Sequence, residues 1–330
     1  MDGSFPAPFY PYGLCVAGAA LVALLLMQWN GKRFSLKNGT ISYLAVLAVP
    51  LGVLCARIGY ALIRFDWMKS KGFAYFVQFH QGGYVLYGAA LGVALAAWIV
   101  ARLTRQRFSD VLDAAAAPAA LMIALCRMAE SLVGLGYGKP IADWFDPFSE
   151  QSMIEWEDPS FLYRFPFGQR GHYGWNFAIF FPEALAALVI CVILLTRKRR
   201  AAGGQAALGA LLYAACQVIL ESMRMDVLTW GFVKANQLLS AVVIAGIIVI
   251  CWLRMPRQDR TPLRIGGAWA LFLACCGVVM AMEFALEQKI GFLAWMRMDV
   301  CYLVMALACL GFIFTVLPLW RRAFPPVDKA

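Results

Sequence analysis

DAAAAPAALMIALCRMAESLVGLG, residues 113–136, is a long apolar run that carries two opposite charges three residues apart. An apolar run of about 20 residues is typical of a helix that crosses the ~30 Å hydrocarbon core of a bilayer. Arg127 and Glu130 interrupt this run, although an ionised side chain at bilayer depth costs at least ~2.5–3.5 kcal/mol on insertion scales. Ionisable residues inside spanning helices mark candidate functional sites. The segment therefore indicates both a membrane fold and the position of a site.

The composition of the whole chain also indicates a membrane protein. Of its 330 residues, 62% are hydrophobic and 15% are charged, whereas soluble domains have roughly 45–50% apolar and about 25% charged residues. Nine apolar blocks are long enough, or nearly so, to cross a bilayer. They lie near 12–29, 41–64, 84–103, 112–135, 177–196, 207–223, 233–253, 266–287 and 298–319. We therefore expect an all-α, polytopic membrane helix bundle with about nine transmembrane helices.

Basic residues lie in every second connection between these blocks. Clusters of three or four Lys and Arg occur in 30–40, 102–107, 197–200 and 254–264, and the C-terminal tail adds three more. Because basic loops stay on the cytoplasmic side, we expect the N-terminus outside and the C-terminus inside. This alternation also supports the short, semi-polar sixth block as a span. Topology and attraction to an anionic leaflet explain the net charge of +10 without a nucleic-acid partner.

Neither the N-terminus nor the cysteines point to further functions. The first eleven residues hold no Lys or Arg, so the first apolar block is expected to be a retained helix and no signal peptide. Most of the ten cysteines lie inside apolar blocks, where Cys behaves as a small hydrophobic residue. No cysteine pair has metal-site spacing near either of the two histidines, His80 and His172. We expect no metal and no dissociable cofactor.

The segment 136–176 is the one sizeable stretch outside the apolar blocks. It is acidic and rich in aromatic residues and proline, and the charge pattern places it on the extracytoplasmic side. A connection of this length is usually functional or disordered. Two interpretations stay open, namely a cap at the outer membrane surface and an aromatic belt at the membrane interface.

Polar residues of at least five blocks converge on one level near the outer leaflet. At ~1.5 Å per residue, Arg57 and Arg127 each stand ~24 Å from the cytoplasmic start of their helices. Arg224 closes the sixth block, and Glu183 lies early in the fifth. The first and third blocks open on Tyr12 and Tyr87. This common depth predicts one polar site close to the outer headgroups.

The residue types at this level suit an anionic lipid. Arginine presents a fixed fork of donors that matches phosphate, so Arg57, Arg127 and Arg224 together predict a phosphate clamp. Glu130 and Glu221 lie three residues from Arg127 and Arg224, the spacing at which helical residues face each other. Three interpretations of these pairs stay open. The pairs offset the cost of burying charge, they form a lipid or substrate site, or they make an ion or proton relay. The relay is the least favoured, because the chain has no matching halves with broken helices.

Six motifs follow one another in a characteristic order. They are YGLCVAG (12–18), ARIGYALI (56–63), QGGYVLYGAALGV (81–93), the basic loop with its apolar run (102–121), CRMAESLVGLGYG (126–138) and ILESMRMD (219–226). Over about 12–254 the chain resembles the prolipoprotein diacylglyceryl transferase family. The resemblance implies seven spans with the orientation that the charges predict. We therefore expect a transferase-like membrane domain over 1–265, and an additional hairpin with a cytoplasmic tail over 266–330.

The resemblance also implies an activity. Members of this family transfer a diacylglyceryl group from phosphatidylglycerol to the thiol of a lipobox cysteine in a prolipoprotein, at the outer leaflet of the bacterial plasma (inner) membrane. The implied partners are phosphatidylglycerol, the prolipoprotein signal peptide with its lipobox Cys, and other membrane lipids. No nucleic acid is implied, and a monomer is expected. The chemistry needs an activated thiol and fixed donors for the departing phosphate.

Several positions match the family's functional residues. The resemblance implies that Arg127 and Arg224 bind phosphate and stabilise the leaving group, and that Tyr12 and Arg57 support the headgroup. The implied lipid-binding positions are Tyr12, Arg57, Gly82, Gly83, Arg127, Gly138, Glu221 and Arg224.

Other positions depart from the family pattern. The family's His-Gly-Gly of the third helix reads Tyr87-Gly88-Ala89 here, and an amide after the signature arginine is replaced by Glu130. Tyr87 and Glu130 are therefore further catalytic candidates beside Arg127 and Arg224, with His80 as an alternative base. Three functions stay open: the family's transfer reaction, a catalytically degenerate lipid- or lipoprotein-binding relative, and a transferase with a changed lipid or acceptor.

Overall fold

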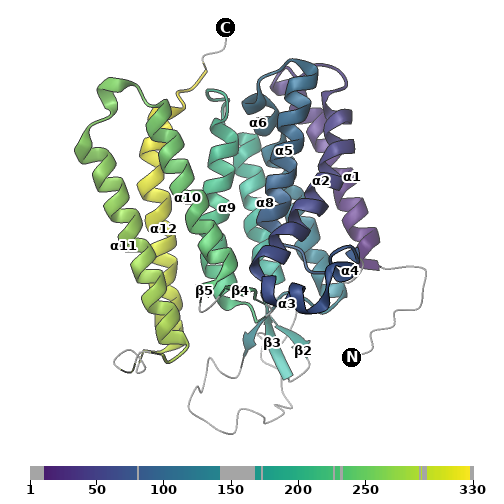
Figure 1. Ribbon diagram of the computed structural model, residues 1–330. Coiled ribbons are helices and arrows are strands. Elements are labelled where there is room, and N and C mark those ends of the chain that lie inside the picture. The colour runs from purple at the N-terminus through teal and green to yellow at the C-terminus, as the bar shows by residue number, and fades with distance from the viewer. Residues whose placement is uncertain are drawn as a thin grey trace.

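Each of the nine predicted apolar blocks forms an α-helix in the computed structural model. The structure describes residues 11–79, 82–141, 168–171, 174–225, 227–230, 233–289, 291 and 296–327. The helices stand side by side as one bundle (Figure 1). The first five are α1 (Pro11–Arg33), α2 (Thr40–Ile63), α5 (Leu86–Thr104), α6 (Phe108–Ala129) and α8 (Phe180–Thr196). The last four are α9 (Gly204–Met223), α10 (Ala235–Arg254), α11 (Pro262–Leu286) and α12 (Met298–Ala323).

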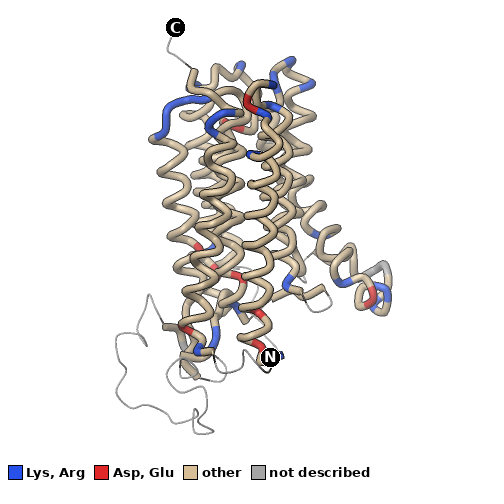
Figure 2. Tube along the Cα trace, turned by 90° about the vertical axis from the view of Figure 1, so that its left-hand side faces the viewer, with Lys and Arg blue, Asp and Glu red and all other residues tan. Residues whose placement is uncertain are grey.

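Eight of these helices are long and apolar enough to cross a membrane. The exception, α8, has 17 residues, or about 25 Å at 1.5 Å per residue. The prediction of an all-α polytopic bundle is confirmed, and the chain is a multi-pass membrane protein. Which terminus faces outward stays a prediction. The basic connections do lie at the end of the bundle that holds the C-terminus (Figure 2).

Glycine allows a close contact between α2 and α5 in the bundle's N-terminal part. A Cβ atom on Gly88 would lie 2.6 Å from the carbonyl oxygen of Cys55. One on Gly92 would collide with the carbonyl oxygen of Leu51. Helices in lipid associate through close packing because hydrocarbon offers no hydrophobic driving force between them. This packing fixes the position of α5, which carries Tyr87.

Two short helices and two small sheets lie at the end of the bundle opposite the C-terminus (Figure 1), and the sequence did not predict them. Helices α3 (Phe65–Lys71) and α4 (Phe73–Phe76) join α2 to α5. Strands β1 (Tyr137–Pro140), β2 (Gly168–Gly171) and β3 (Gly174–Ala178) form an antiparallel sheet in the order β1-β3-β2. Strands β4 (Thr229–Trp230) and β5 (Val233–Lys234) form a two-stranded hairpin.

Strands β1, β2 and β3 make up most of the described part of the segment 136–176. Gly171 pairs with Gly174 in the β2–β3 register, and Tyr137 pairs with Ala178 across β1 and β3. Residues 142–167 lie outside the described part of the chain, as do His80 and His172. The choice between a cap and an aromatic belt therefore stays open.

The C-terminal hairpin packs on the rest of the bundle through α12. Helix α12 contacts both α9 and α10, whereas α11 contacts mainly α12. Buried side chains of the hairpin, among them Val279, Met305 and Phe312, belong to the same apolar core cluster as Leu211 and Ile244. The predicted boundary at residue 265 falls in the first turn of α11, and the hairpin shares the core of the preceding helices.

Candidate functional site

The predicted site begins where α6 ends. The helix stops at Ala129, and Glu130 opens a single 3-10 turn, Glu130–Leu132. The chain then turns back toward α8 through Gly134 and Gly136, whose φ angles are 65° and 75°. A Cβ atom on Gly136 would lie 2.7 Å from Oε2 of Glu130. Position 136 therefore requires glycine for two reasons. Its backbone is left-handed, and the Glu130 carboxylate occupies the space that a side chain would need.

Four charged side chains from separate elements close a ring at this end of the bundle. Arg127 Nη1 lies 2.5 Å from Glu130 Oε1, and Arg127 Nε lies 2.9 Å from Glu183 Oε2. Arg224 Nη1 lies 2.6 Å from Glu183 Oε2, and its Nη2 lies 3.3 Å from Glu130 Oε2. Positive and negative groups alternate around the ring. We call Arg127, Glu130, Glu183 and Arg224 the four-charge ring.

The four-charge ring is buried and formally neutral. Its side chains range from 13% exposed at Arg127 to 2% exposed at Glu183. Removing one partner of a buried ion pair leaves an uncompensated charge and typically costs about 3–5 kcal/mol. Oε1 of Glu183 is buried and has no hydrogen-bond partner among the described residues. An unpaired buried acceptor is costly, so this oxygen is open to a donor from a bound molecule.

Only one of the two expected helical ion pairs takes the predicted form. Arg127 and Glu130 pair at the i, i+3 spacing. Arg224 pairs with Glu130 and Glu183, which lie on other elements. Glu221 accepts hydrogen bonds from Gln217 (3.2 Å) and Asn236 (3.0 Å).

Arg224 reaches across the bundle because α9 ends one residue earlier, at Met223. Arg224 is extended, with φ −75° and ψ 150°, so the helical spacing rule no longer applies to it. It forms an antiparallel bridge with Gly138. A Cβ atom on Gly138 would lie 2.6 Å from Cγ1 of Ile179. Position 138 therefore has no room for a side chain, and the backbone of Gly138 pairs with that of Arg224. The lipid contact that the family resemblance implied for Gly138 stays a prediction.

Tyr12 and Tyr87 differ in their relation to the ring. Tyr12 of α1 lies within electrostatic range of Glu130, Arg127 and Arg224. The Tyr87 hydroxyl lies 2.5 Å from the Ser240 hydroxyl on α10, which in turn donates to the carbonyl of Asn236. Because Asn236 also donates to Glu221, a polar layer connects α5, α9 and α10. Tyr213 on α9 lies within electrostatic range of both Tyr87 and Arg127.

Arg57 lies in a different environment. Its side chain is fully buried, and it donates to the carbonyls of Tyr75 (2.7 Å), Phe76 (3.2 Å) and Gly83 (3.3 Å). It also donates to the carbonyl of Gly82. A Cβ atom on Gly83 would lie 2.6 Å from Nη1 of Arg57. Arg57, Gly82 and Gly83 therefore make one contact that fixes the connection between α2 and α5, and their predicted lipid contact stays a prediction.

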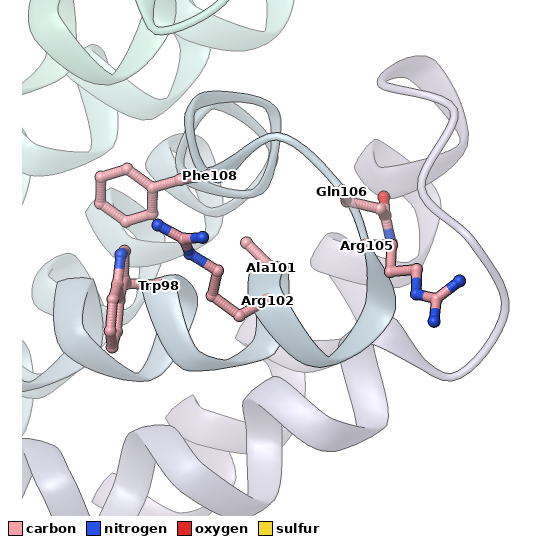
Figure 3. A pocket seen from close by; sticks show the side chains of 6 residues that line it. All are labelled: Trp98, Ala101, Arg102, Arg105, Gln106 and Phe108. Atoms are coloured by element: carbon pink, nitrogen blue, oxygen red, sulfur yellow. The ribbon is translucent and has the colours of Figure 1, made fainter.

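A hollow of about 520 Å³ lies at the end of the bundle that holds the C-terminus, away from the ring. Trp98, Arg102, Gln106 and Phe108 help to line it, and the Arg102 guanidinium lies 5.5 Å from the Trp98 ring centre. Figure 3 shows Arg102 directed between the rings of Trp98 and Phe108. An arginine beside a tryptophan at a helix end is typical of the membrane interface.

Comparison with known proteins identifies the family of this chain. Residues 4–253 match the family described as prolipoprotein diacylglyceryl transferase. The chain belongs to this family. The match contains all four residues of the four-charge ring and excludes the α11–α12 hairpin. The members of this family are transferases, so this chain is a transferase. The match confirms the resemblance that the six motifs indicated.

Curated relatives cover most of the chain at low identity. A protein of Listeria monocytogenes serotype 4b is 27% identical over 257 residues, which are 74% of this chain and 86% of the relative. A protein of Symbiobacterium thermophilum is 28% identical over 75% of this chain and 90% of its own length. One of Clostridioides difficile is 25% identical over 76% and 92%. Each is named phosphatidylglycerol–prolipoprotein diacylglyceryl transferase.

Sequence reasoning missed Glu183 as the link between the two arginines. The signal was available, because Glu183 is an acid early in an apolar block at the same depth as Arg224. Nothing in the sequence pairs it with a residue 41 positions away. It also missed Tyr213, a tyrosine inside a semi-polar span, whose position depends on how α9 packs.

Proposed function

We propose that this chain transfers a diacylglyceryl group from phosphatidylglycerol to the thiol of a lipobox cysteine in a prolipoprotein. The reaction takes place at the outer leaflet of the bacterial inner membrane. The sulfur bonds to the glyceryl carbon while the bond from that carbon to the phosphate oxygen breaks. Glycerol phosphate leaves with the bonding electrons, and the thiol proton passes to a base.

The four-charge ring is the observation that carries the proposal. Arg127 and Arg224 place two guanidinium groups within a few ångströms of each other, bridged by shared carboxylates. Preorganised donors of this kind stabilise charge that develops on a leaving group, and they are worth far more in a water-poor site than in water. The ring lies where α6 and α9 end and α8 begins. The basic connections lie at the opposite end of the bundle (Figure 2), so charge placement makes the ring's end the outer one.

Glu183 is our candidate for the base that takes the thiol proton. Both arginines use its Oε2, which leaves the buried Oε1 free to accept. The oxygens of Glu130, in contrast, each contact an arginine. A proton on Glu183 removes one negative charge from the ring as the leaving phosphate gains one. Proton transfer and leaving-group stabilisation are then coupled, and the histidine of the family pattern is not needed.

The neutrality of the ring favours one alternative function. Glu130 stands where the family has an amide, and it pairs with both arginines. If these pairs persist when lipid binds, the chain holds a phospholipid headgroup without turning it over. Such a protein is a lipid- or lipoprotein-binding relative of the transferases.

Transfer by the purified full-length chain separates the two functions. The chain is reconstituted in vesicles that contain phosphatidylglycerol labelled in its acyl chains and a peptide with a lipobox cysteine. We expect label on the peptide and an equal amount of free glycerol phosphate. Arg224→Gln should lose both products, whereas Arg102→Gln, the control arginine at the other end, should keep them. Lipid binding by the wild type without either product would reject transfer and support the binding function.

A further inference from the structure

A cavity of about 340 Å³ opens between α10, the last helix of the region that matches the family, and α11, which lies outside that region. Helix α11 contacts mainly α12 and touches α10 much less, and α12 in turn packs on α9 and α10 (Figure 1). Apolar side chains make most of the lining. They include Leu238, Ala241 and Ala245 of α10, Phe272 and Cys276 of α11, and Phe312 of α12.

One end of the cavity is polar and ordered. Lys234 Nζ lies 2.8 Å from Glu283 Oε2, and the other oxygen of Glu283 accepts a hydrogen bond of 2.5 Å from Gln237. Lys234 also donates to the carbonyl of Ser222 at 3.1 Å. The side chains of Lys234 and Glu283 are 11% and 10% exposed, and both line the cavity. The cavity is therefore amphipathic, with its charged end at the α9 terminus that leads to Arg224.

The ammonium group of Lys234 has capacity for a third acceptor. A lysine carries three N–H donors and no acceptor. Among the described residues, its hydrogen bonds go to Ser222 and Glu283, so one donor remains. A phosphate oxygen at the mouth of the cavity would complete this set with a charge-assisted hydrogen bond.

The volume of the cavity limits which molecule its apolar part can hold. A helix with its side chains is about 10–12 Å wide, so a signal peptide or a helix of a second copy is too large for about 340 Å³. This volume lies at the lower end of the ~300–1,000 Å³ of small-molecule sites. We propose that the α10–α11 cavity binds one acyl chain of a membrane phospholipid, with the phosphate of that lipid held by Lys234. This site is separate from the four-charge ring and does not depend on transfer.

Neighbouring positions on each wall give matched variants. Ala245 lines the cavity, whereas a side chain added at Gly246 meets nothing within 4 Å. On the opposite wall, Cys276 lines the cavity and Gly277 faces open space. Tryptophan at Ala245 or Cys276 should fill the cavity, while Gly246→Trp and Gly277→Trp should leave it empty.

Native mass spectrometry of the full chain, purified in detergent and supplied with phosphatidylglycerol, tests the site. We expect the wild type, Gly246→Trp and Gly277→Trp to retain one phospholipid in excess over the cavity-filling variants. Ala245→Trp and Cys276→Trp should lose this lipid while their circular dichroism is unchanged. Lys234→Gln should lower retention about fivefold to tenfold, the effect of one charge-assisted hydrogen bond. Equal retention by wild type and both cavity-filling variants would overturn the proposal.

Discussion

Two groups of buried arginine lie at the same end of this protein and differ in what surrounds them. Arg57 donates to backbone carbonyls, whereas Arg127 and Arg224 share two carboxylates. A carbonyl oxygen cannot take up a proton under physiological conditions, so the charge around Arg57 is fixed. A carboxylate can, so the net charge of the four-charge ring can change within a reaction cycle. We therefore propose a positioning role for Arg57 and a reactive role for the ring.

Loss of a ring arginine is the largest effect that this comparison predicts. Arg127→Gln should lower kcat/KM about 10²–10³-fold, the usual loss when one preorganised donor to a developing charge is removed. It should also cost about 3–5 kcal/mol of stability, because a buried carboxylate loses its partner. Transfer assays and thermal unfolding in detergent measure the two effects separately.

The double variant Arg127→Gln/Glu130→Gln sharpens this prediction. It removes one charge of each sign, so we expect stability to recover while transfer stays low. Recovery of transfer together with stability would mean that Arg127 only offsets the burial of Glu130.

Gly136→Ala should have the next largest effect, because it disturbs the ring without removing a charge. The left-handed backbone at this position disfavours alanine by roughly 1–2 kcal/mol, and the new Cβ would lie 2.7 Å from Oε2 of Glu130. We expect a roughly tenfold lower kcat, a smaller loss than the ~10²-fold that a 1 Å misplacement at a reacting centre can cause. Gly246→Ala, which has open space, is the control and should retain wild-type kcat.

Arg57→Lys should affect stability more than activity. An ammonium has three donors and cannot serve all the carbonyls that Arg57 reaches, so about 1–3 kcal/mol should be lost with each acceptor left unpaired. Activity per folded molecule should stay within about twofold, the scatter expected for a residue outside the reacting centre. A selective loss of kcat at unchanged unfolding temperature would break the distinction between Arg57 and the ring.

Tyr87→Phe should give the smallest change. It removes the hydroxyl that lies 2.5 Å from Ser240, and a single hydrogen bond contributes about 0.5–1.5 kcal/mol net. We expect a slightly lower unfolding temperature and a modest loss of transfer. A loss as large as that of Arg127→Gln would support Tyr87 as a catalytic residue, the prediction made from its place in the family pattern.

The sequence predicted the helices well because length and apolar content decide whether a segment spans a membrane. It predicted Arg127 with Glu130 because both lie within one continuous turn. It could not predict the pairing of Arg224 with Glu183, which depends on α9 ending at Met223 and on the bridge to Gly138. The strands around Gly138 escaped prediction for a similar reason, since their pairing joins distant and short segments. The roles of all candidate site residues stay predictions.

The most direct test of the central claim is the kinetics of Glu183→Gln, measured as glycerol phosphate released per lipidated thiol. The substitution leaves the ring with a net positive charge, so phosphatidylglycerol should bind at least as tightly as it does to the wild type. Without the proton acceptor, kcat should fall about 10²–10⁴-fold, the usual contribution of a general base. Asp110→Asn, a carboxylate near the other end that pairs with Arg199, should retain wild-type kinetics. Wild-type kcat in Glu183→Gln would contradict the account.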